Sequence, residues 1–126
     1  MAANFISLIV PAYKQEKTII EDIKSLDFVL GSLSTEYEII VVVDGFLDKT
    51  YEKLKEIKNN KVILIGYGEN KGKGFAIKLG VEKARGDIIK TIDYHLSIPN
   101  ESSNIVDIKK LGIGMGIYTR IYMLYF

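Results

Sequence analysis

Acidic and imidazole side chains follow two of the apolar segments of this chain, where they are free to meet a ligand. Asp44 follows the run 39–43, and Asp93 follows the run 88–92, with His95 two residues further on. A carboxylate and an imidazole on the same side of an extended segment can bind a divalent metal ion together. Asp93 and His95 are therefore the candidate metal ligands. A lone histidine more often has a structural or solvated role, which makes His95 the conditional member of the pair.

A polar, glycine-rich segment, Gly66–Gly74, carries the second group of candidates. Lys71, Gly72 and Lys73 precede an apolar, helix-like pattern. Two ammonium groups beside a helix N-terminus favour an anion such as a phosphate. The segment is not a Walker loop, because it lacks that motif's first glycine and has Gly74 in place of Ser or Thr. The alternative is a solvated loop that only begins a helix.

Pro11 and Tyr13 follow the first apolar run and form the third group. The tyrosine ring could stack on a nucleotide base, and Asp44 could accept a hydrogen bond from a base N–H. The alternatives are a half-buried tyrosine in a turn and a loop aspartate that binds backbone amides. No G-x-G-x-x-G motif stands at this turn, so a dinucleotide site for NAD or FAD is not expected.

Strands and helices that alternate along the chain must position these residues. Runs rich in isoleucine and valine predict strands at 5–10, 37–43, 62–65 and 88–92. Apolar residues three and four apart predict helices that begin at Thr18, in a capping box with Glu21, at Asp48 or Thr50, and at Phe75 with an inner face of Ile77, Val81 and Ala84. A further helix from Pro99 and a strand at 112–120 complete the pattern.

This βαβ alternation predicts an α/β fold: a Rossmann-like, mostly parallel sheet flanked by helices, in one domain spanning residues 1–126. The first four strands should lie in the order three-two-one-four, which brings the strand ends that carry the candidate residues to one edge.

Composition excludes several classes of function. The 126 residues carry a net charge of +1 and include no cysteine, which excludes disulfides, thiolate catalysis and cysteine-ligated zinc. The balanced charge gives no reason to expect a nucleic-acid partner. No apolar stretch reaches the roughly 20 residues that span a bilayer, so a cytoplasmic location is the expectation.

Four segments in this order resemble the inverting family-two glycosyltransferases of the GT-A fold, in particular the polyprenyl-phosphate (dolichol-phosphate) mannose and glucose transferases. The segments are Val10–Tyr13, Tyr37–Gly45, Asn70–Gly74 and Ala84–Asp93. The resemblance implies a UDP- or GDP-hexose donor, with Mg²⁺ or Mn²⁺ on its diphosphate. It implies donor contacts at Pro11, Tyr13, Val42, Asp44, Lys71, Gly72, Lys73, Asp93 and Arg120. The implied acceptor is a polyprenyl phosphate or a glycan, which suggests the inner face of a membrane.

The sequence departs from the family pattern at informative positions. Val43 stands where the family has the first acid of an Asp-Asp pair, and Lys14 begins a Lys-Gln pair where it has Asn-Glu. His95 replaces the second acid of Asp-x-Asp. Because magnesium prefers oxygen ligands, this change favours manganese or another nitrogen-tolerant metal, or weakens metal binding. The family's acceptor side and catalytic base lie beyond Arg120.

We therefore expect this chain to be the nucleotide-binding half of such an enzyme, and whether it is itself an enzyme is left open. The alternative is a non-catalytic nucleotide-binding fragment or remnant. A plain doubly wound scaffold is the third class, which the acids at the strand ends argue against. An edge exposed where the other half would pack favours a homodimer.

Overall fold

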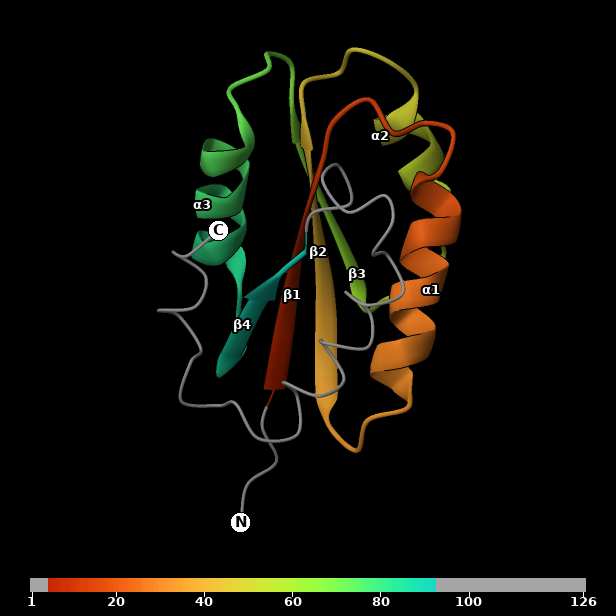
Figure 1. Cartoon of the computed structure of the whole chain (residues 1–126), viewed down its shortest axis with the longest axis vertical. Coiled ribbons are helices and arrows are strands. Elements are labelled where there is room, and N and C mark those ends of the chain that lie inside the picture. The colour runs from red at the N-terminus through yellow and green to blue at the C-terminus, as the bar shows by residue number, and fades with distance from the viewer. Residues whose placement is uncertain (1–4, 93–126) are drawn as a thin grey trace.

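The computed structural model describes residues 5–92 and shows a parallel sheet with helices on both faces (Figure 1). Its elements are β1 (Phe5–Ala12), α1 (Ile19–Gly31), β2 (Glu36–Asp44), α2 (Thr50–Leu54), β3 (Val62–Tyr67), α3 (Lys73–Lys83) and β4 (Ile88–Thr91). The strand order is β3-β2-β1-β4 and every pair is parallel, which confirms the predicted fold class and strand order. The helix expected from Pro99 and the strand expected at 112–120 lie outside the described residues.

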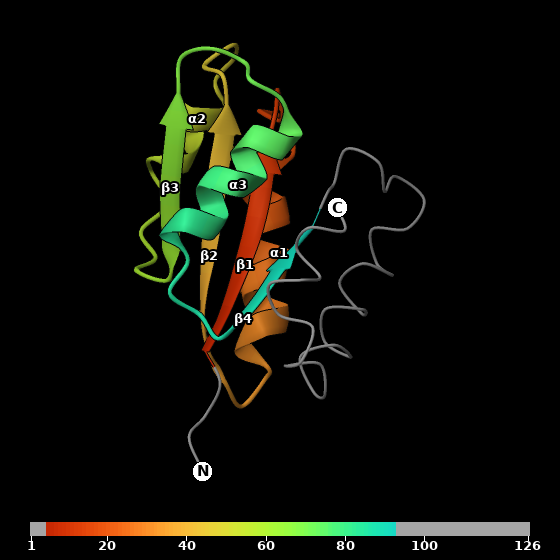
Figure 2. The ribbon, with the colours of Figure 1, turned by 90° about the vertical axis from the view of Figure 1, so that its left-hand side faces the viewer.

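The two central strands are buried on both faces because helices cover the sheet from opposite sides. Helices α1 and α2 lie on one face and α3 on the other (Figures 1 and 2). Alternate residues of β1 therefore enter two different cores: Leu8 packs in the α1 cluster and Ile9 in the α3 cluster. This double burial accounts for the continuous β-branched run of β2. Within the described residues, no helix is long and apolar enough to cross a membrane.

Helix α1 presents the predicted inner face but not the predicted cap. Its buried residues are Ile19, Ile23, Leu26 and Leu30. The Thr18 side chain makes no capping hydrogen bond, because its backbone (φ −121°, ψ −14°) lies outside the extended region typical of N-cap residues. Glu21 lies instead 3.8 Å from Lys24, on the exposed side of the helix. The predicted capping box is therefore wrong.

Helix α3 begins two residues earlier than predicted and faces the sheet with smaller residues. The buried positions are Ala76, Ile77 and Gly80, whereas Val81 and Ala84 are only partly covered. A Cβ atom at Gly80 would lie 2.6 Å from Cγ2 of Ile9, so the missing side chain allows the helix to approach β1. The predicted inner face is corrected accordingly.

We expect Gly80→Ala to lower the free energy of unfolding by about 1–3 kcal/mol, because the added methyl group overpacks the contact between α3 and β1. Gly74→Ala is the matched control, since a Cβ there meets nothing within 4 Å in the first turn of the same helix. That control should be neutral or stabilising, because alanine favours helix over glycine. Urea unfolding of both variants measures the difference, and equal effects would contradict the close approach.

Candidate functional site

The loops that follow β1, β2 and β3 meet at one end of the sheet (Figure 1). The strand register places Pro11 opposite Val42, and Asp44 opposite Tyr67. The carboxyl ends of three neighbouring strands thus come side by side, as the predicted strand order requires. Residues 31 and 23 positions apart in the sequence thus become neighbours at this edge.

Asp44 anchors the glycine-rich loop through four hydrogen bonds. It is 3% exposed. One carboxylate oxygen accepts bonds from the Tyr67 hydroxyl (2.8 Å) and the Lys71 amide (2.7 Å). The other accepts bonds from the Asn70 side chain (2.7 Å) and the Gly72 amide (3.0 Å). Asp44 therefore satisfies backbone amides, as the alternative interpretation proposed, and direct contact with a base stays a prediction.

Two glycines with positive φ angles allow the loops to pack this closely. Gly72 (φ +95°) immediately precedes α3, and Gly45 (φ +97°) follows Asp44. A Cβ at Gly45 would lie 3.0 Å from the Asn70 amide nitrogen. Both positions adopt a backbone conformation that residues with a side chain rarely take. The backbone therefore favours glycine at both positions.

Tyr67 connects Asp44 to the start of α3, and sequence reasoning missed its role. Burial, followed by the hydrogen bond to Asp44, raises the pKa of Tyr67 well above its ordinary value, so the hydroxyl remains a donor. The ring meets Phe75 edge-on, with 5.2 Å between centroids. The Lys71 ammonium lies 5.3 Å from the Phe75 centroid. The role of Tyr67 could have been predicted from the strand order, which pairs the last residues of β2 and β3.

The first turn offers an aromatic side chain beside the same edge. Tyr13 is exposed, and the Lys14 ammonium lies 5.5 Å from its ring centroid. Pro11 is buried as part of β1. Val42 is fully buried in the core beneath α3, between β1 and β3, so neither its backbone nor its side chain is open to a ligand, and the predicted direct contact is corrected. Tyr13 is therefore the member of this group that is open to stacking.

A second carboxylate network connects the β1–α1 loop to the β2–α2 loop. Asp48 accepts hydrogen bonds from the Thr50 amide (2.9 Å), the Thr50 hydroxyl (2.6 Å) and the Glu16 amide (3.3 Å). Glu16 in turn accepts a bond from the Lys49 amide (2.8 Å). Asp48 therefore binds the first amide of α2, but Lys49, and neither Asp48 nor Thr50 as predicted, occupies the N-cap position.

This network makes stability depend on pH at the acidic end. Burial alone would raise the pKa of Asp48, but the hydrogen bonds from Thr50 and the Glu16 amide lower it below the ordinary 3.8. The unfolded chain then binds the proton more tightly, so the stabilisation is complete above pH 3.8 and is lost as pH falls below it. We expect Asp48→Asn to reduce the loss of unfolding free energy at low pH, measured by urea unfolding at a series of pH values. If the variant loses as much unfolding free energy at low pH as the unaltered chain does, Asp48 does not have this role.

The remaining candidates lie outside the described residues. Asp93, His95 and Arg120 are among them, so the structure does not place the predicted metal ligands. Within residues 5–92, no three acidic or histidine side chains come together in a way that would hold a metal ion.

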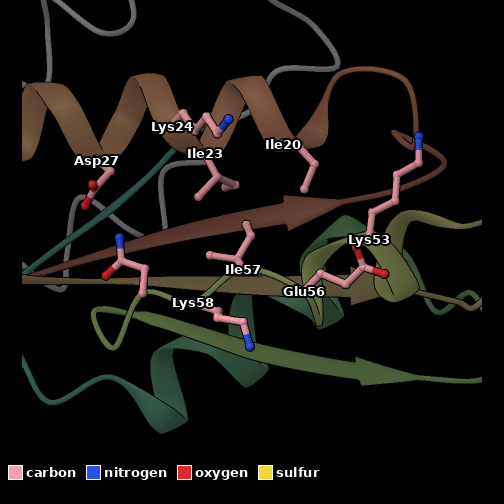
Figure 3. Close-up of a pocket in the computed structure, with 9 residues that line it drawn as sticks. Ile20, Ile23, Lys24, Asp27, Lys53, Glu56, Ile57 and Lys58 are labelled. Atoms are coloured by element: carbon pink, nitrogen blue, oxygen red, sulfur yellow. The ribbon is translucent and has the colours of Figure 1, made fainter.

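A groove of about 420 Å³ lies away from these loops, between α1 and the segment that begins in α2 (Figure 3). Ile20, Ile23 and Ile57 form its apolar part, and charged side chains such as Lys53 and Glu56 surround it. None of the predicted site residues lines this groove. The chemistry suggested by the sequence is therefore at the strand ends and not in this groove.

Comparison with known sequences finds related transferases. The profile of the family "Glycosyl transferase family 2" matches residues 7–104. The undecaprenyl-phosphate 4-deoxy-4-formamido-L-arabinose transferase of Proteus mirabilis is 34% identical over 101 residues, which cover 78% of this chain and 31% of that protein. The protein of the same name from Pseudomonas fluorescens is 31% identical over 101 residues, covering 78% and 30%. The chain thus spans about 30% of the length of these relatives.

Comparison with solved structures finds the same fold. TarS of S. aureus (residues 1–349), solved in complex with UDP, aligns with a TM-score of 0.61 and 29% identity over 70% of this chain and 26% of TarS. The mannosyltransferase PcManGT of Pyrobaculum calidifontis, solved with GDP-Man and Mn²⁺, aligns with a TM-score of 0.62 and 21% identity over 74% and 28%. The second likeness shows the fold alone.

Proposed function

The chain belongs to glycosyl transferase family 2, and from this premise we propose that it binds a nucleotide-sugar donor at the carboxyl ends of its strands. The observation that carries the proposal is the loop arrangement around Asp44, which fixes the start of α3 at the same end of the sheet as the loop that follows β1 (Figure 1). This arrangement forms without a ligand, because protein donors already occupy the Asp44 carboxylate. Preorganised sites bind with a smaller entropic cost.

Each candidate residue has a role that its environment allows. The Tyr13 ring stacks on the base, while the buried Pro11 and Val42, which are paired across β1 and β2, hold the turn that carries Tyr13. Lys71 and Lys73 supply positive charge to the diphosphate beside the N-terminus of α3. Gly72 and Asp44 act by holding that loop in place. Arg120 is proposed, from the family pattern alone, as a further contact with the donor.

A divalent metal ion completes the proposed donor site, and we favour Mn²⁺ over Mg²⁺. Asp93 and His95 would hold it, with further ligands from the diphosphate and water, since a carboxylate and an imidazole suit a nitrogen-tolerant metal. When bound, the ion neutralises charge as the bond between sugar and phosphate breaks. The solved complex of PcManGT with GDP-Man and Mn²⁺ is consistent with this choice.

We expect Mn²⁺ to bind the free chain weakly and to bind about tenfold or more tightly with a nucleoside diphosphate present, because each supplies ligands for the other. Asp93→Asn should remove that strengthening. Isothermal titration of Mn²⁺ into the free chain, the nucleotide complex and the variant measures it. Equal affinities in all three would remove Asp93 from the metal site.

The proposed acceptor is a polyprenyl phosphate or a glycan. The relatives named above are undecaprenyl-phosphate transferases, which supports the first class. Such an acceptor places the protein in the cytoplasm, at the inner face of a membrane. We further propose that residues 1–126 form a single nucleotide-sugar-binding domain, which could associate as a homodimer.

A second candidate function is nucleotide binding without turnover. The observation that favours it is Val43, which is 1% exposed and packs in the core where the family pattern has an acid. Thermal shift with UDP, GDP and their sugars, with and without Mn²⁺, tests both candidates. Stabilisation together with release or transfer of sugar supports the enzyme, and stabilisation alone supports the binding module. No stabilisation by any nucleotide would contradict both.

A further inference from the structure

Large apolar side chains are exposed mainly at the carboxyl end of the sheet. Five such side chains are exposed within residues 5–92, and four of them lie in or beside the loops at that end. These four are Tyr13, Phe46, Leu47 and Phe75. Phe46 and Leu47 are adjacent in the β2–α2 loop, and each is 48% exposed. The fifth, Phe28, is 80% exposed on α1.

Charges at the same end are arranged with lysines outward and carboxylates inward. Four lysines in these loops are exposed: Lys14, Lys17, Lys49 and Lys71. The Asp44, Asp48 and Glu16 carboxylates accept hydrogen bonds from loop amides instead. Glu69, 3.8 Å from Lys71, is the exposed acid within these loops, and Glu21 and Glu52 are exposed in the first turns of α1 and α2. The surface presented outward is therefore cationic and apolar together.

We propose that this surface docks onto an anionic lipid bilayer. We call it the carboxyl rim, and its members are the exposed residues at this end that have no proposed donor contact: Lys14, Lys17, Phe46, Leu47, Lys49 and Phe75. Aromatic and leucine side chains enter the boundary between headgroups and acyl chains, while lysines meet anionic headgroups. These apolar side chains are carried by separate elements, the β2–α2 loop and the first turn of α3. A deformable bilayer accommodates such separated side chains better than a rigid groove on a partner protein does.

A second copy of the chain fits this surface less well than a bilayer does. A two-fold contact through the rim would bring the same three lysines of both copies together, and like charges across an interface oppose association. The anionic bilayer has the complementary charge. Docking also orients the loops of the proposed donor site toward the membrane, although the vesicle test below does not depend on nucleotide binding.

Co-sedimentation with vesicles tests the rim. The chain should bind vesicles of phosphatidylglycerol and phosphatidylcholine more tightly than vesicles of phosphatidylcholine alone, and added salt should weaken that preference. Phe46→Ser with Leu47→Ser should weaken binding by about tenfold or more, because two apolar side chains no longer enter the bilayer. Lys17→Glu with Lys49→Glu should remove the preference for anionic vesicles. None of these four residues belongs to the proposed nucleotide contacts.

Matched controls lie elsewhere on the molecule. Phe28→Ser removes the most exposed aromatic side chain, and Lys58→Glu with Lys78→Glu makes the same charge change on residues outside the rim. Both should bind vesicles as the unaltered chain does. The proposal is overturned if the Phe46/Leu47 variant binds anionic vesicles normally, or if Phe28→Ser weakens binding equally. It is also overturned if the rim variants change the oligomeric state, measured by light scattering, without changing vesicle binding. Nucleotide thermal shifts of the same variants report on the donor site separately.

Discussion

Glu38→Ala is expected to lower the free energy of unfolding by about 2–4 kcal/mol, because it leaves buried donors without an acceptor. Glu38 is 1% exposed in β2. Its carboxylate accepts bonds from the Ser7 hydroxyl (2.7 Å), the Arg85 amide (2.9 Å) and the Arg85 Nε (3.0 Å). The Ser7 hydroxyl in turn accepts a bond from the Gly86 amide (2.9 Å). One carboxylate thus connects β1 and β2 to the turn that leads into β4.

Glu36→Ala, two residues earlier in the same strand, is the matched control for this measurement. Glu36 is exposed, and its oxygen lies 3.9 Å from the Lys61 ammonium. Exposed pairs of this kind contribute about 0–1 kcal/mol, so the control should change stability little. Urea unfolding compares the two variants. Equal losses would mean that the Glu38 network does not hold the β4 turn.

Asp44→Ala is expected to weaken nucleotide binding by about 1–3 kcal/mol, which is the cost of leaving a buried polar partner unpaired in the loop. The change releases the amides of Lys71 and Gly72 together with Tyr67 and Asn70. Hydrogen exchange at the two amides should become faster, and titration calorimetry with UDP or GDP should show the weaker binding. Tyr67→Phe should act in the same direction with a smaller effect, because it removes one of the four donors.

Asp27→Ala separates this effect from general destabilisation. Asp27 also accepts a hydrogen bond from a tyrosine hydroxyl, that of Tyr37 (2.7 Å), but it lies on α1 beside the groove. This variant should lose stability and keep its nucleotide affinity. If Asp44→Ala binds nucleotide as tightly as the unaltered chain, the loop is not part of a donor site.

The sequence predicted the sheet well because local patterns and chirality determine it. The β-branched run before Asp44 determines where β2 lies, and right-handed crossovers restrict the strand order. The strand ends of Pro11 and Asp44 were therefore placed together correctly. The predicted end of the first strand at Val10 is wrong, because β1 continues through Pro11 to Ala12. Periodicity failed on α3, since counting apolar residues ignores the small Gly80 that sets the helix against Ile9.

The hydrogen bonds of the loops could not be predicted from local sequence. The donors to Asp44 come from residues 23 to 28 positions away, so they become visible only when β3 lies beside β2. The role of Tyr67 depends on the same strand register and was missed for the same reason.

The central claim is that the strand ends, and not the groove between α1 and α2, bind the nucleotide. Mapping amide chemical shifts by NMR as UDP or GDP is added to the labelled chain tests this claim most directly. We predict that the largest shifts occur at Tyr13, Lys14 and the segment 70–74, with little change at Lys53 or Ile57. Shifts concentrated at Lys53 and Ile57, or no shifts with either nucleotide, would contradict the claim.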